Sequence, residues 1–247
     1  MSAHARRAGR LELADIVQAH AGQLTGLSAT QRQVVQAITA CRTAALGGHR
    51  RACAQCGHQE IAYNSCRDRH CPKCQGLEAA RWMDAQQRDL LPVPYFHVVF
   101  TVPAELHALF LAAPKATYSL LFAAVAETLT QVALRRLGAK IAVTAILHTW
   151  TQLLLFYPHI HCIVPGGGLD PGHTHWIAAR AAFFLPVRIL AEVFRGTLLA
   201  TLETAIDRAT IPARRDDNPH DRLTRAAATH WVVYCKPPFA GPEQVLA

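Results

Sequence analysis

The sequence has 247 residues, of which 51% are hydrophobic and 17% are charged, with a formal net charge of +8. Globular domains average about 45–50% apolar and about 25% charged residues, so this composition excludes a mainly disordered chain. No run approaches the ~18 consecutive apolar residues of a membrane-spanning helix, and the charged residues among the first 25 positions argue against a signal peptide. The positive charge favours a polyanionic partner such as nucleic acid. The alternative is a GC-rich coding bias, which would also enrich the chain in Ala and Arg. Without a membrane-spanning run, no membrane partner is expected.

The first part of the chain is expected to be helical around a metal-held loop. Apolar residues at helical spacing predict helices over residues 11–22 and 28–46, the second beginning with a capping box of Ser28 and Gln31. Residues 49–75 are rich in Cys, Arg and His and show little periodicity, which is typical of a small metal-stapled loop region. A third helix is expected from about residue 77 to 90.

The second part is expected to be mixed, and we place the domain boundary at about residue 92, which gives domains of residues 1–91 and 92–247. The pattern predicts strands over residues 95–101, 140–150, 159–164, 176–184 and 230–235, and helices over 103–112, 114–137 and 186–209, with a charged loop over 212–222. A short connection at about 153–158 suits an antiparallel pair. The predicted fold class is α+β, with a zinc-stapled helical domain followed by an antiparallel sheet flanked by helices.

Five of the eight cysteines fall within 22 residues, in two C-x-x-C pairs and one single position. The pairs predict a four-thiolate zinc site of Cys53, Cys56, Cys71 and Cys74, with Cys66 as the main substitute ligand. The alternative is a set of buried free cysteines. A zinc deaminase is disfavoured because the proline lies inside the second pair, whereas the deaminase signature has it before the pair. A closed four-thiolate site has no position for a reacting water, so we interpret it as structural.

Basic side chains surround the predicted zinc site. Arg67, Arg69, Lys73 and Arg81 are candidate DNA phosphate contacts. The alternative is an ordinary solvated basic face.

A second candidate metal site is the pair His159 and His161. Residues two apart share one face of a strand but diverge on a helix, so the pair is a metal half-site if this segment is extended. The preceding strand should supply a third ligand, for which we favour Gln152, with His148 next. Open coordination positions would suit Mg²⁺ or Mn²⁺ holding a phosphate oxygen. A lone H-x-H is more often structural, and the pair His173 and His175 is interpreted as a surface pair beside a turn.

An ordered series of motifs resembles one known family. The motifs are CRTAALGGH (41–49), SCRDRHCPKCQ (65–75), LLPVPYFHVVFT (90–101), HTW (148–150), HIHCIVPGGG (159–168), FFLPVR (183–188) and KPPFAGP (236–242). The chain resembles the rolling-circle insertion-sequence transposases of the two-tyrosine HUH type that carry an N-terminal zinc-binding domain, the insertion sequence ninety-one family. This resemblance strengthens the metal interpretation of the histidine pair.

The resemblance implies an HUH-type catalytic domain that acts on single-stranded DNA at transposon ends. The metal held by His159 and His161 polarises the scissile phosphate, a tyrosine attacks to form a 5′-phosphotyrosine, and no nucleotide cofactor is needed. The family's H-P-H-x-H reads Tyr157-Pro-His-Ile-His here. A bacterial DNA-acting protein of this kind is expected in the cytoplasm, associated with the nucleoid when bound to DNA.

The tyrosine helix of the family is expected beyond the segment that resembles residues 241–247, so this chain is expected to be truncated and impaired in strand transfer. None of its own tyrosines has the expected arrangement, two on one helix face four residues apart. These are Tyr63, Tyr95, Tyr118, Tyr157 and Tyr234. Water would then replace the tyrosine in any weak cleavage. The alternatives are a non-catalytic zinc-dependent DNA-binding fragment or regulator of transposition, and a relaxase-like or replication-initiator-like nickase.

Overall fold

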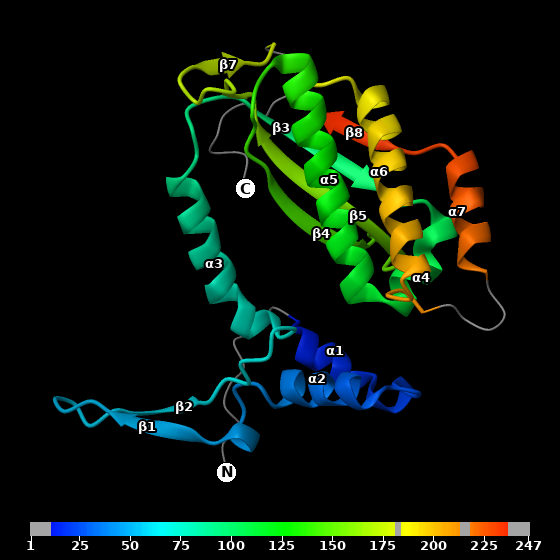
Figure 1. Cartoon of the computed structure of the whole chain (residues 1–247). Coiled ribbons are helices and arrows are strands. Elements are labelled where there is room, and N and C mark those ends of the chain that lie inside the picture. The colour runs from blue at the N-terminus through cyan, green and yellow to red at the C-terminus, as the bar shows by residue number, and fades with distance from the viewer. Residues whose placement is uncertain (1–10, 181–183, 213–217, 237–247) are drawn as a thin grey trace. The chain divides into compact units, whose positions relative to one another are not determined.

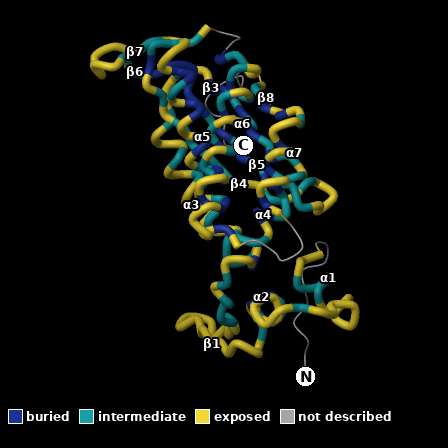
Figure 2. The backbone as a smooth tube through the Cα atoms, turned by 45° about the vertical axis from the view of Figure 1, so that its right-hand side comes forward, coloured by how far each residue is buried: buried dark blue, intermediate teal, exposed yellow. Residues whose placement is uncertain are grey.

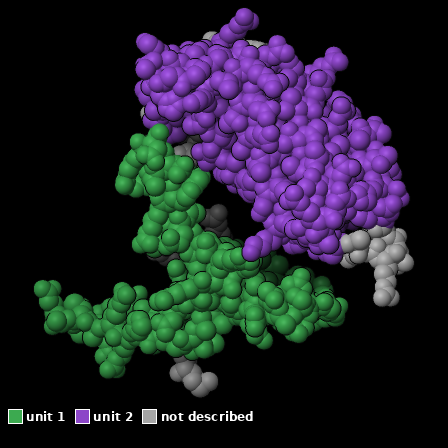
Figure 3. All heavy atoms as spheres, in the orientation of Figure 1, with its two compact units in different colours: residues 1–89 green, residues 90–247 purple. Residues whose placement is uncertain are grey.

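A computed structural model describes residues 11–180, 184–212 and 218–236 of the chain. The chain divides into two compact units, residues 1–89 and residues 90–247, and the sequence analysis placed this division two residues later (Figure 3). The motif residues 237–242, the segment 241–247 and parts of the expected strand 176–184 and loop 212–222 lie outside the described residues. The class is α+β with antiparallel sheets, as predicted.

Unit 1 contains helices and one two-stranded hairpin. Its elements are α1 (Leu13–Ala19), the 3-10 turns η1 (Ala21–Gln23) and η2 (Ala44–Leu46), α2 (Ala29–Ala40), β1 (Gly48–Ala52), β2 (Gln59–Tyr63) and α3 (Pro72–Arg88). The predicted capping box begins α2, where the Ser28 hydroxyl accepts from the Gln31 amide and the Gln31 side chain accepts from the Ser28 amide. The hairpin was not predicted, because β1 lacks a regular alternation of apolar and polar residues and both strands are exposed along most of their length.

Unit 2 is built around a four-stranded antiparallel sheet with strand order β4-β5-β3-β8. Its elements are β3 (Tyr95–Thr101), η3 (Ala104–Leu106), α4 (His107–Ala112), α5 (Pro114–Leu137), β4 (Thr144–Trp150), β5 (Phe156–Pro165), β6 (Gly167–Leu169), β7 (Trp176–Ala178), α6 (Val187–Asp207), α7 (Pro219–Ala228) and β8 (Val233–Lys236). The strands β6 and β7 form a separate antiparallel pair. The predicted antiparallel pairing of the 140–150 and 159–164 segments is confirmed by β4 and β5.

Two long helices, α5 and α6, cover one face of the four-stranded sheet (Figure 1). The buried residues of α6 recur every four positions, as in Leu190, Phe194, Leu198 and Leu202. Phe194 packs edge-on against Phe100 of β3, with ring centroids 5.0 Å apart. Helix α5 is long and apolar enough to cross a membrane by length and composition, but eight of its residues are buried, six of them in this core. Its end at Gly138, which has φ +72°, is as predicted.

Alternation along β5 separates the two faces of the sheet. Ile160, Cys162 and Val164 are buried in the core beneath the helices, whereas His159 and His161 are half-buried on the opposite face. The same alternation in β3 buries Phe96, Val98 and Phe100 and leaves His97 half-buried. One face therefore carries the apolar core and the other carries histidines, which positions the site.

Candidate metal centres

Three histidines converge on the face of the sheet that the helices leave uncovered. His148 on β4 lies directly opposite His159 on β5, and His161 follows two positions further along the same face. Their ring centroids are 5.3 Å (His148–His159), 4.1 Å (His148–His161) and 4.9 Å (His159–His161) apart. One nitrogen from each of the three lies within 4.8 Å of the others, so the rings can meet on one ion. The extended conformation on which the histidine-pair hypothesis depended is present.

The other ring nitrogens of the two β5 histidines are already occupied. Nδ1 of His159 lies 2.7 Å from the carbonyl oxygen of Tyr157, to which it donates. Nδ1 of His161 lies 2.7 Å from Nε2 of His97 on β3, and these two rings stack with centroids 4.9 Å apart. Such partners fix the ring orientation of metal-binding histidines and leave Nε2 for the ion. Sequence analysis missed His97; the signal would have been its position in the strand paired with β5.

Burial favours the neutral form of His161, His148 and His97. Burial and the nearby His148, His97, His159 and Lys236 lower the pKa of His161 to about 4. Burial and then His159 lower the pKa of His148, and burial, then Lys236, lowers the pKa of His97. Neutral imidazole is the form that coordinates a metal, so these pKa directions suit a cation site at neutral pH.

Gln152, the favoured third ligand, is not placed on this face. Gln152 would share the face of His148 only if the strand continued to residue 152, but β4 ends at Trp150 and its pairing shifts between His148 and Trp150. Beyond it the chain turns, with the Leu154 amide bonded to the Thr151 carbonyl oxygen at 2.9 Å. Gln152 lies exposed in this turn. The preference for it over His148 was therefore wrong, because a bulge and a turn end the alternation that the argument needed.

Four cysteine thiols meet in unit 1, from Cys41, Cys66, Cys71 and Cys74, with all four sulfurs within 4.8 Å of one another. The Sγ of Cys74 lies 3.6 Å from that of Cys41 and 3.6 Å from that of Cys66. Zinc–sulfur bonds of ~2.3 Å in a tetrahedron give sulfur–sulfur edges of about 3.8 Å, so the thiols present fit a zinc ion. We call these residues the four-cysteine cluster.

Local backbone geometry turns N–H groups toward the four-cysteine cluster. The Cys66 amide donates to Sγ of Cys41 and the Asp68 amide donates to Sγ of Cys66, each at 3.5 Å. Arg67, between them, has the left-handed φ of 55°. Burial raises the pKa of the Cys74 thiol, but hydrogen bonds from Cys41, Cys66 and the Arg67 amide outweigh burial and lower it to about 7. The first turn of α3 supplies Cys71 and Cys74 from one side.

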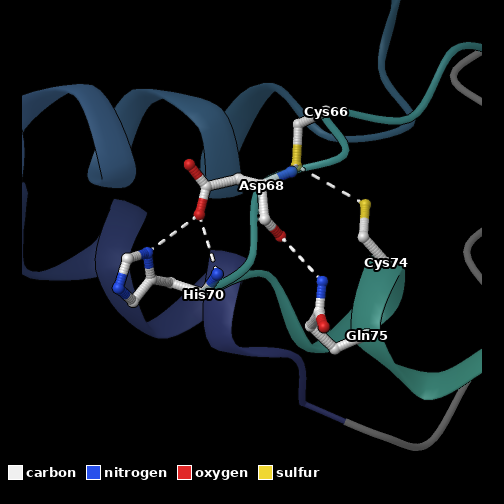
Figure 4. Close-up of polar contacts among 5 residues, drawn as sticks. All are labelled: Cys66, Asp68, His70, Cys74 and Gln75. Atoms are coloured by element: carbon white, nitrogen blue, oxygen red, sulfur yellow. Dashed lines mark hydrogen bonds and ion pairs between the residues drawn. The ribbon is translucent and has the colours of Figure 1, made fainter. Parts of the chain in front are cut away.

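A carboxylate fixes the loop that precedes α3 (Figure 4). Oδ1 of Asp68 accepts from the amide of His70 at 2.8 Å and lies 3.0 Å from Nδ1 of its ring. The backbone bond to His70 is the largest cause that lowers the pKa of Asp68. His70 thus helps to hold the loop shape and points its ring away from Cys66 and Cys74 (Figure 4).

The structure divides the predicted zinc ligands between two places. Cys71 and Cys74 are in the four-cysteine cluster and the substitute Cys66 is a full member, whereas Cys53 and Cys56 lie exposed in the turn between β1 and β2. The prediction of Cys53, Cys56, Cys71 and Cys74 around one ion was therefore wrong. The reason is the hairpin, which carries the first C-x-x-C pair away on extended strands, while Cys41, at the end of α2, takes part instead.

The four basic candidates for DNA contact differ in their surroundings. Arg67 and Arg69 are exposed. Lys73 forms an ion pair with Glu12, and Arg81 pairs with Glu78 one helical turn earlier at 2.9 Å. Lys73 and Arg81 would have to exchange these carboxylates for a phosphate.

Two known protein families match the regions of the chain that contain these two centres. Residues 13–102 match the family described as a transposase zinc-binding domain, and residues 142–247 match the family described as a putative transposase. The putative transposase y4qJ of Sinorhizobium fredii is 50% identical over 248 residues, covering 95% of this chain and 62% of that protein. The chain belongs to the insertion-sequence transposases.

A second relative gives the same assignment. The transposase for insertion sequence element IS801 of Pseudomonas savastanoi pv. phaseolicola is 33% identical over 154 residues, covering 62% of this chain and 37% of that protein. The transposase chain therefore spans between about a third and two thirds of the length of these relatives. Its zinc-binding match contains the whole four-cysteine cluster, which supports a structural zinc ion, and its putative transposase match contains the three histidines.

Solved structures show a distant likeness to the transposase chain. The conjugative relaxase TrwC in complex with oriT DNA, in its metal-bound structure, shares 14% identity over 53% of this chain and 62% of that chain, with a TM-score of 0.33. A copper-bound structure of the same complex shares 13% identity over 61% of this chain and 66% of that chain, also with a TM-score of 0.33.

Proposed function

We propose that this transposase chain binds single-stranded DNA of transposon ends in the cytoplasm and holds one phosphodiester group against a divalent metal ion. His148, His159 and His161 would hold the ion, which when bound polarises a phosphate oxygen. The observation that carries the proposal is the convergence of three imidazoles, two of them oriented by partners, on a half-exposed sheet face. No nucleotide cofactor enters the proposal.

The donor set bears on which metal is bound. Mg²⁺ prefers an octahedral shell of oxygens, whereas imidazole nitrogens suit transition metals. With His148 as third ligand in place of an amide oxygen, we expect Mn²⁺ to bind more tightly than Mg²⁺. Three protein ligands leave positions open for phosphate oxygens.

Side chains beside the histidines fit a single strand of DNA. Lys236 on β8 lies opposite His97 on the same face, and its ammonium group can meet a phosphate. Trp150, at the end of β4, is 56% exposed and offers an aromatic surface for an unpaired base. A duplex would bury its bases from this surface, so the proposal predicts a preference for single-stranded DNA.

Within these 247 residues we propose water, and no tyrosine, as the nucleophile. Tyr95 is buried and its hydroxyl accepts from the Leu91 amide, while Tyr118 packs against Phe110. Tyr157 and Tyr234 share the histidine face of the sheet but stand singly on different strands. The resemblance implies a helical tyrosine pair for strand transfer, and none of these tyrosines forms one. We therefore expect these 247 residues to give weak hydrolysis without a covalent intermediate.

The test compares labelled single-stranded transposon ends with the same sequence as duplex, with Mn²⁺, Mg²⁺ or chelator. We expect Mn²⁺-dependent retention of the single strand, lost in the double variant His159→Ala/His161→Ala. The double variant His173→Ala/His175→Ala is a matched control, because it removes an H-x-H pair from an exposed turn. Equal binding of duplex, or binding indifferent to His159 and His161, would overturn the proposal.

The nucleophile is tested on a denaturing gel of the same reactions. Released fragments without a protein-linked band support water. A covalent band contradicts this part of the proposal, and its loss in Tyr157→Phe or Tyr234→Phe would identify the residue.

A second candidate function is a zinc-dependent DNA-binding regulator that does not cleave. Exposed arginines in unit 1 favour it, namely Arg67 and Arg69 beside the four-cysteine cluster and Arg51 on β1. It predicts that DNA retention persists without Mn²⁺ and is lost on removing zinc. Substituting Arg67 and Arg69 by Ala would then reduce the salt dependence of binding by about one unit of slope for each phosphate contact.

A further inference from the structure

The first C-x-x-C pair lies outside the four-cysteine cluster. Cys53 and Cys56 occupy the turn that joins β1 to β2, and both are exposed free thiols. The four-cysteine cluster already supplies four sulfurs to one tetrahedral site, so it needs no further ligand. The turn thiols are therefore available to another ion.

The backbone of the turn is shaped around the Cys53 thiol. The Gly57 amide donates to the Cys53 carbonyl oxygen at 2.9 Å, with Gly57 at a left-handed φ of 70°. The amides of Cys56 and Gln55 and the thiol of Cys56 hydrogen-bond the Cys53 sulfur. N–H groups directed at a sulfur stabilise the thiolate, which is the form that binds metal.

Strand register adds a histidine to the two thiols. The β1–β2 pairs run from Gly48 opposite Tyr63 to Ala52 opposite Gln59. One further step places Cys53 opposite His58, and the Cys53 amide donates to the His58 carbonyl oxygen at 2.9 Å. Opposed residues point to one face with Cβ atoms about 4.5–5.5 Å apart. His58 is exposed, so its ring can rotate toward the thiols.

We propose that Cys53, Cys56 and His58 bind a second zinc ion at the tip of the hairpin, separate from the ion of the four-cysteine cluster. Two thiolates and an imidazole are ordinary zinc ligands, and water can take the fourth position. In the structure no third ligand atom from a described His, Cys, Asp or Glu lies within 4.8 Å of both thiols, so zinc binding requires the His58 ring to turn.

The hairpin also needs a stabilising contact of this kind. All five residues of β1 and the first three of β2 are exposed, and the small core of unit 1 contains no residue of either strand. An isolated two-stranded hairpin is marginally stable in water. A metal ion bound at the turn would cross-link the two ends of the turn and stabilise the hairpin. It would thereby hold the exposed Arg50 and Arg51 in fixed positions.

The test counts metal on the full chain, reduced throughout, in a His159→Ala/His161→Ala background that removes the histidine site. We expect two zinc ions per chain by native mass spectrometry, and one in the added double variant Cys53→Ser/Cys56→Ser. In the parent background with Cys53 and Cys56 intact, His58→Ala should weaken the affinity for the second zinc ion at least tenfold. His49→Ala is the matched control, because His49 is on the same face of β1 but four residues away, about 13 Å along the strand.

A second readout separates loss of a ligand from loss of folding. With Co²⁺ in place of zinc, thiolate-to-cobalt absorbance should fall from six thiolates to four in Cys53→Ser/Cys56→Ser, while amide exchange in α2 and α3 stays slow. Faster exchange should be confined to β1 and β2. One zinc ion per chain in the parent background, absorbance unchanged by the double variant, or a Cys53–Cys56 disulfide that persists in zinc and reductant would each overturn the proposal.

Discussion

Each of the two units is stabilised internally in a different way. Unit 2 buries a large apolar core, with Phe96, Phe100, Phe110 and Phe194 fully enclosed. Figure 2 shows unit 1 mostly exposed or intermediate along its backbone. Among the described residues of unit 1, three are buried in its core, and two of them, Cys41 and Cys71, are members of the four-cysteine cluster. A small unit with so little apolar burial needs metal in its place. The two units should therefore fail under different treatments.

The largest expected effect comes from removing zinc from unit 1. Structural zinc contributes apparent free energies of about 10–16 kcal/mol in zinc-finger peptides, so Cys71→Ser or a strong chelator should unfold unit 1. Hydrogen exchange should show fast amides in α2 and α3 and slow amides in β3 and β5. Cys235→Ser, in a strand of unit 2, is the control and should leave unit 1 protected. If the amides of unit 1 still exchange slowly without zinc, zinc does not stabilise this unit and the proposed contrast between the units is wrong.

The converse change is a cavity in unit 2. Phe100 is fully buried against Phe194, so Phe100→Ala should reduce the free energy of unfolding of unit 2 by about 3–5 kcal/mol. Urea unfolding followed by near-ultraviolet circular dichroism measures this loss, and zinc content should not change. Leu111→Ala, at a residue 61% exposed, is the control and should shift stability much less. Loss of zinc in the Phe100 variant would show that the units are not independent.

A smaller effect should separate metal binding from folding inside unit 2. His97 hydrogen-bonds the His161 ring and stacks on it, so His97→Ala should weaken Mn²⁺ binding about 10–100-fold. His97→Gln should recover part of the affinity, because its amide can hydrogen-bond the His161 ring. Calorimetric titration measures both. If Ala and Gln weaken binding equally, His97 acts through packing and does not orient His161.

The smallest effect is the pH dependence of the metal-free chain. The pKa of His161 is about 4 in the folded state and 6.5 in its ordinary state, because burial first and the neighbouring histidines and Lys236 second disfavour its charged form. Between these values the unfolded chain binds more protons, so the free energy of unfolding falls as pH decreases from about 6.5 toward 4. His161→Asn should flatten this dependence. Partial exposure of the ring keeps the effect modest.

Much of unit 2 could be predicted from sequence, because its segments are long and strongly periodic. The helix Pro114–Leu137 and the antiparallel pair β4–β5 match their predictions closely. Helix α7 was missed because its residues are charged, although Asn218, whose side chain accepts from the His220 amide, and Pro219 together form a start signal. The β1–β2 hairpin was missed because neither strand has a buried apolar face.

The sites show the same division. His159 and His161 could be found because alternation along one strand determines that they share a face. Their partners His148 and His97 depend on cross-strand register, which local patterns do not contain. The prediction of which cysteines share one zinc ion was wrong for a related reason. Spacing shows which thiols are close in sequence, whereas the hairpin determines which are close in space.

Alternation along β5 also has an evolutionary consequence. Neighbouring positions of this strand serve separate demands, since Ile160 and Cys162 hold the protein together and the residues between them face the solvent side. Under the proposed function, changes in metal preference or DNA binding can therefore accumulate one substitution at a time without a matching change in the interior. The buried scaffold would then stay stable while the proposed site diverges.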